Sequence, residues 1–95
     1  MKKINLYDIV KGTSTNADGH LLYLAIEKEL RQGSDVRLSL SGCTPMSSSF
    51  LNSSFGELLT VFGHNVVRQK VKLVNFKPSD AQRIKEYILK VPQTV

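Results

Sequence analysis

Hydrophobic residues recur along this chain with two alternating spacings, one typical of strands and one typical of helices. Segments with apolar residues at alternate positions predict three strands, at residues 3–10, 36–40 and 71–76. Apolar residues three or four positions apart predict three amphipathic helices, over residues 17–32, from the serines at 47–49 to Phe62, and from Ser79 to Val91. The elements therefore alternate, beginning with a strand and ending with a helix.

The residues that flank these helices fit the chemistry of helix ends. Asn16 or Asp18 has a side chain suited to cap the first helix, and Gly33 can adopt the left-handed conformation that often follows a helix. Ser79 and Gln82 have the spacing of a capping box, with Ser79 as the N-cap of the third helix.

Strands that alternate with helices of this length favour a mainly parallel sheet. We predict a small α/β fold of βαβαβα order, in a single domain that spans residues 1–95. The expected core consists of large apolar residues from the helices: Leu22, Ile26, Phe50, Phe55, Leu58, Phe62 and Ile88. Three strands make a small sheet, so either a fourth strand lies in residues 65–69 or an edge can pair with another chain, which leaves a homodimer open.

Charge is spread unevenly over the 95 residues. The net charge is +5, and the whole excess lies in residues 64–95, which carry seven lysines and arginines against Asp80 and Glu86. Such a segment can contact nucleic acid or an acidic protein surface. Exposed aromatic residues are not interleaved with these cations as they are in many nucleic-acid-binding surfaces. We therefore expect a solvated surface, with binding to nucleic acid through residues 68–90 as an alternative.

The sequence shows neither a membrane span nor a signal-peptide core. No apolar run approaches the roughly 20 residues that span a bilayer, and polar residues interrupt the segment after the two N-terminal lysines. We expect a cytoplasmic protein.

Few residues have the spacing of a catalytic or metal site. His20 and His64 lack a second ligand at helical spacing and are predicted to lie on the surface. Cys43 is the one cysteine and is predicted to be a small buried residue. Glycine-rich phosphate loops are absent. We expect no enzyme activity, cofactor or metal, with a small-ligand site at the end of the second strand, near Cys43, as an alternative.

The segment from Ser41 to Phe50 is the strongest local feature. A strand ends, a short loop follows, and Ser47, Ser48 and Ser49 open an apolar helix. Hydroxyl groups and free backbone N–H groups at a helix N-terminus suit an anion or a phosphorylation site. The same residues also suit plain helix capping.

The run V-x-L-x-L-S-G-C-T-P-M-S-S-S-F-L-x-x-x-F-G-E-L, from Val36 to Leu58, resembles the STAS-like domain family of unknown function. These short bacterial domains are related to the STAS domains of anti-sigma-factor antagonists and sulfate transporters. The V-K-L-V-N-F run of the third strand and the glycines around the first helix fit as well, so the resemblance covers nearly all of the chain.

The resemblance implies a regulatory, non-enzymatic protein-binding module. Its partner would be a histidine-kinase-like ATPase or another signalling protein, docked at the N-terminus of the second helix. The implied docking residues, which include a serine for phosphorylation, are Thr44, Ser47, Ser48, Ser49 and Asn52. This chain departs from the D-S-S-G or D-S-T-G pattern of the antagonists, because Ser47 and Phe50 replace the aspartate and the glycine and Ser39 replaces an acidic residue.

Overall fold

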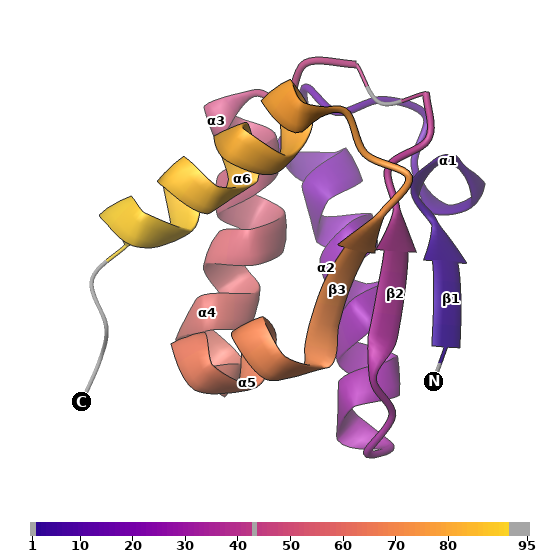
Figure 1. Cartoon of the computed structure of the whole chain (residues 1–95), viewed down its shortest axis with the longest axis vertical. Helices are drawn as coiled ribbons and strands as arrows, with labels where there is room; N and C mark the ends of the chain where they lie inside the picture. Colours follow the sequence, from indigo (N-terminus) through magenta and orange to yellow (C-terminus); the bar gives the residue numbers. More distant parts are fainter. Residues whose placement is uncertain (1, 43, 92–95) are drawn as a thin grey trace.

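The computed structural model describes residues 2–42 and 44–91, and it shows a three-stranded parallel sheet with helices packed against it (Figure 1). The strands lie in the sheet in sequence order: β1 (Lys2–Asn5), β2 (Val36–Ser39) and β3 (Val71–Val74). Both neighbouring pairs are parallel. The predicted small α/β class with a parallel sheet is confirmed.

The first strand is shorter than predicted. β1 ends at Asn5, and the helix α1 (Leu6–Ile9) replaces the second half of the strand expected at residues 3–10. Leu6 and Val10 are both buried, and the Val10 N–H donates to the Leu6 carbonyl at 3.0 Å. These two residues are four positions apart, a spacing that places them on one side of a helix and also on one face of a strand. The short segment therefore fits either element, and tertiary packing favours the helix.

The first long helix, α2 (Asn16–Arg31), begins one residue earlier than predicted and has a different cap. Thr15 is extended, and its side chain accepts a hydrogen bond from the Asp18 N–H at 3.1 Å. The prediction of Asn16 or Asp18 as the cap is wrong, because both already lie inside the helix. Gly33 follows the helix with a φ of +80°, the left-handed conformation that was expected.

Helices occupy the whole stretch between Ser48 and β3 apart from Gly63. The predicted second helix is a continuous run with a π-helical segment in it: α3 (Ser48–Leu51), η1 (Asn52–Gly56) and α4 (Glu57–Phe62). Then α5 (His64–Lys70) replaces the fourth strand considered at residues 65–69, which is a correction. His64 and Val67 are both buried at helical spacing, so packing outweighs the strand preference of valine.

The last helix, α6 (Pro78–Lys90), starts without the predicted capping box. Pro78 occupies the first turn, where its fixed φ favours the helix and the absent N–H costs nothing. Ser79 is therefore inside the helix, and the Gln82 side chain donates to Glu86 at 3.0 Å instead of reaching back. The expected cap at Ser79 is wrong.

The core lies between the sheet and the helices. Five of the seven predicted core residues are buried, and Phe62 and Ile88 are half-buried against them. The second strand supplies Val36 and Leu38 to the same core. Its apolar side chains come from many short elements.

No helix among the described residues is long and apolar enough to cross a membrane.

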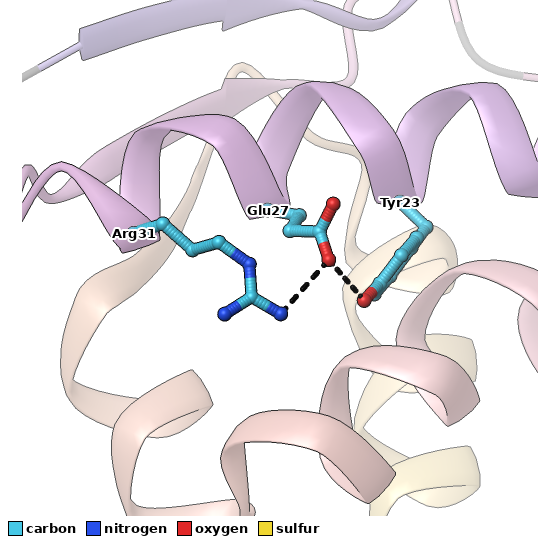
Figure 2. A network of polar contacts seen from close by, with 3 residues as sticks. All are labelled: Tyr23, Glu27 and Arg31. Carbon is cyan, nitrogen blue, oxygen red and sulfur yellow. Dashed lines mark hydrogen bonds and ion pairs between the residues drawn. The ribbon is translucent and has the colours of Figure 1, made fainter.

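A polar network of three residues runs along one side of α2 (Figure 2). The Tyr23 hydroxyl donates to Glu27 at 2.7 Å, and Arg31 donates to the same carboxylate oxygen at 3.1 Å. Burial raises the pKa of Tyr23, and its bond to Glu27 adds to the rise. The bond from Tyr23, followed by the bond from Arg31, lowers the pKa of Glu27. The Arg31 guanidinium also lies 5.3 Å from the centre of the Phe62 ring, so this network connects α2 with α4.

Candidate functional site

The three consecutive serines at the start of α3 have different roles. Ser47 is extended, and its hydroxyl accepts a hydrogen bond from the Phe50 N–H at 3.1 Å, so it is the N-cap. Ser48 and Ser49 are exposed in the first turn, and neither hydroxyl bonds to any other residue that the structure describes. One serine therefore holds the helix end, and the other two are accessible.

A buried threonine ties the loop before α3 to the loop before α2. The Thr13 hydroxyl lies 2.8 Å from the Thr44 hydroxyl and 3.0 Å from the carbonyls of Thr44 and Pro45. The Thr13 carbonyl accepts from the Ser47 N–H at 2.9 Å, and the Tyr7 hydroxyl accepts from the Thr44 N–H at 2.9 Å. The predicted residues Thr44 and Ser47 are thus brought together and held in place. Thr13 lies in a turn-rich segment without periodicity, so sequence reasoning missed it.

Asn52, the last of the predicted site residues, faces the C-terminal helix. Its side-chain oxygen accepts a hydrogen bond from the Tyr87 hydroxyl at 2.6 Å. Asn52 lies one turn after Ser48, so the accessible serine and this contact share a side of the helical run. Burial raises the pKa of Tyr87.

The π-helical segment η1, in the middle of the helical run from Ser48 to Phe62, packs against α2. Ser54, fully buried, donates to the Phe50 carbonyl at 2.7 Å, and Ser53 donates to the Ser49 carbonyl at 3.0 Å. Such bonds compete with the regular helical ladder and accompany local distortion. A side chain at Gly19 of α2 would meet the Phe50 carbonyl at 2.5 Å, so this close approach requires glycine.

A small hollow opens between the loop before α3 and the start of α6. Pro45, Met46, Ser79, Asp80 and Arg83 line it, and its volume is about 210 Å³. Arg83 donates to the Met46 carbonyl at 3.3 Å. Asp80 is 7% exposed, and its Oδ2 atom has no hydrogen-bond partner among the described residues. This place holds an unsatisfied acceptor, but it is smaller than the roughly 300 Å³ at which ligand pockets begin.

A family model for a STAS-like domain of unknown function matches residues 18–81, more than half of the chain. The protein is a member of the STAS-like domain family. Searches of curated proteins and of solved structures found no match. The matched range contains most of α2, together with β2, the helical run from Ser48 to Phe62 and β3, so it includes all five predicted site residues of this STAS-like domain.

The histidines of the STAS-like domain differ from each other in burial. His20 is exposed and stacks on Tyr23 with ring centres 6.1 Å apart, as predicted for a surface residue. His64 is buried, which corrects the prediction, because its ring lies 3.1 Å from the Val91 carbonyl under the end of α6. Cys43, predicted to be buried, lies outside the described residues. Among those residues no group of three potential ligands is close enough to hold a metal ion.

One face of the sheet in the STAS-like domain carries a row of cations. The register sets Lys3 opposite Arg37 and Arg37 opposite Lys72, and all three side chains are exposed. Lys70, in contrast, is paired with Asp35 at 3.2 Å. Lys72, from the basic last third of the chain, therefore lies beside cations of two other strands. Sequence reasoning missed the row because only the register defines it.

Proposed function

We propose that this STAS-like domain is a non-enzymatic regulatory module that docks a protein partner through Thr44, the serines at 47–49 and Asn52. The division of roles among the serines carries the proposal. Ser47 holds the helix end, while Ser48 and Ser49 present accessible hydroxyls beside it. A phosphate on either would leave the cap intact and change the surface charge by about −1.5 to −2.

Hydrogen bonds within the domain hold both ends of the proposed docking surface. Thr13 and Tyr7 hold the loop at Thr44, and Tyr87 holds Asn52. A preordered surface loses little conformational entropy on binding, which favours affinity. The first helical turn also tolerates a negative charge, because the helix dipole favours anions there. Phosphorylation at Ser48 or Ser49 would therefore act on the partner and not on the fold.

The partner is proposed to be a signalling protein such as a histidine-kinase-like ATPase. Membership of the STAS-like family supports a regulatory role, and the spare acceptor on Asp80 beside Pro45 and Met46 would suit a donor group of the partner. The hollow lined by Pro45, Met46 and Asp80 is only about 210 Å³, which favours a protein contact there over an enclosed small ligand.

The test begins with capture of partners from the source cell on the immobilised domain, followed by their identification and affinity measurement. We expect Ser48→Asp or Ser49→Asp to change the affinity of the captured signalling protein by about tenfold, with an unfolding temperature close to that of the wild type. The controls are Lys90→Gln at the end of α6 and Gln32→Glu after α2, which alter charge on exposed residues away from the docking segment. Wild-type affinity in both aspartate variants would place the docking face elsewhere.

A further inference from the structure

The edge of β3 borders an apolar groove. The sheet order leaves β3 as the edge strand nearest to α6 (Figure 1), and no strand among the described residues pairs with its outer side. Between this strand and α6 lies a groove of about 610 Å³. Its size is within the range of sites that bind ligands or peptide side chains. None of its lining residues belongs to the docking segment at Thr44 to Asn52.

The groove offers both backbone and side-chain contacts. The Leu40 N–H donates to the Val74 carbonyl at 3.0 Å, so the backbone of Val74 faces β2. Because these groups alternate along a strand, the N–H and carbonyl of Leu73 face the free edge. Phe76 and Leu89, which also line the groove, are 45% and 70% exposed. A free edge beside unburied apolar side chains is a template for an added strand.

The charge of the residues that line the groove indicates which kind of molecule would bind in it. Seven of the ten lining side chains are apolar, and the other three are the cations Arg68, Lys72 and Lys85. A symmetric pairing of two β3 strands would bring the cations of both copies to one interface, which disfavours a second copy. Single-stranded nucleic acid is usually bound by stacking of successive bases on aromatic side chains, and Phe76 is the one aromatic residue in this lining.

We propose that an extended segment of a partner protein, with apolar and acidic residues in alternation, adds to the edge of β3 and fills this groove. Its backbone pairs with Leu73, its apolar side chains contact those of α6, and its carboxylates point to the opposite face, where Lys72 lies. Arg68 and Lys85 add to the positive potential that attracts the acidic segment to the groove. This second surface is separate from the serine docking site and extends the proposed function to a domain with two binding faces.

The probe is a synthetic peptide of about nine residues with alternating valine and glutamate, titrated into the isotopically labelled domain. We expect saturable binding with a dissociation constant below about 1 mM and slower hydrogen exchange at the Leu73 amide. A peptide with lysine in place of glutamate, and a peptide whose backbone is N-methylated at alternate residues, should each bind at least about tenfold more weakly.

Matched variants locate the site. Leu89→Glu and Lys85→Glu should each lower the affinity for the acidic peptide by about fivefold or more. Leu24→Glu and Lys28→Glu, at exposed positions of α2, should leave that affinity unchanged. Ser48→Asp should leave peptide affinity unchanged, which separates this proposal from the proposed function. Thermal unfolding of each variant shows that it is folded.

Four results would overturn the proposal. They are no binding of the acidic peptide at about 1 mM, equal binding of the acidic and basic peptides, a dimer in solution that Leu89→Glu dissociates, and tight oligonucleotide binding that Lys85→Glu abolishes.

Discussion

The hydroxyl of Tyr87 lies in the space above Gly56 and donates a 2.6 Å hydrogen bond to Asn52. A Cβ atom at Gly56 would stand 2.5 Å from that hydroxyl, so the glycine makes room for the ring end and Asn52 holds it there. Through this contact the position of α6 is coupled to the helical run that carries Ser48 and Ser49.

Loss of the Tyr87 hydroxyl should loosen α6. Tyr87→Phe is expected to lower the free energy of unfolding by about 0.5–1.5 kcal/mol, the usual net value of a hydrogen bond, and to speed hydrogen exchange in α6. A double-mutant cycle with Asn52→Ala measures the coupling, and the second substitution should cost little once the first is present. Fully additive effects would show that the contact contributes nothing to stability.

Leu58 on α4 is fully buried, so its truncation should be costly. Leu58→Ala is expected to lower the free energy of unfolding by about 2–5 kcal/mol, through lost burial and a residual cavity. Denaturant titration followed by circular dichroism measures the change. The matched control is Val61→Ala on the same helix, since Val61 is 43% exposed. A cost for Leu58→Ala below about 1 kcal/mol would contradict its place in the core.

Gly19 should resist a substitution that normally favours helices. Alanine in a helix interior stabilises by about 0.5–1 kcal/mol relative to glycine, yet the added Cβ would collide with Ser53 Oγ and the Phe50 carbonyl. We expect Gly19→Ala to destabilise by about 1–3 kcal/mol, with partial recovery in the double variant with Ser53→Ala. Gly12→Ala is the control, because its new Cβ would lie 3.7 Å from its nearest neighbour, Asp18 Oδ2. Stabilisation by Gly19→Ala would show that the helices can separate at little cost.

Alkaline pH should destabilise the domain through two tyrosines. Burial raises the pKa of Tyr23 and that of Tyr87. The native state therefore holds these protons more tightly than the unfolded state does. The resulting stability is complete below the ordinary tyrosine pKa of about 10 and is lost as the pH rises through the folded-state values. Urea midpoints measured between about pH 8 and about pH 11 should fall, and the double variant Tyr23→Phe and Tyr87→Phe should show a shallower fall. Equal slopes in the two proteins would exclude this origin.

Local patterns determined the alternation of strands and helices. The apolar spacing over α2 and over the run from Ser48 to Phe62 placed both helices, since an amphipathic face of this length has one favourable way to be buried. Gly33 was placed at a helix end by its freedom at positive φ. Ser47 lay within the predicted cap cluster for an equally local reason, because its hydroxyl reaches a backbone N–H three residues ahead.

Short segments were decided by tertiary contacts instead. The apolar spacing of residues 6–10 and 64–70 fits a strand as well as a helix. Both segments are helical because the helix buries Leu6, Val10 and Val67 in the core. The contact between Tyr87 and Asn52, which are 35 residues apart, depends on how α6 lies against η1. The cation row and the groove beside β3 likewise exist only once strand register and helix position are set. Both features depend on contacts between segments that are far apart in the sequence, and the local spacing of apolar residues does not specify such contacts.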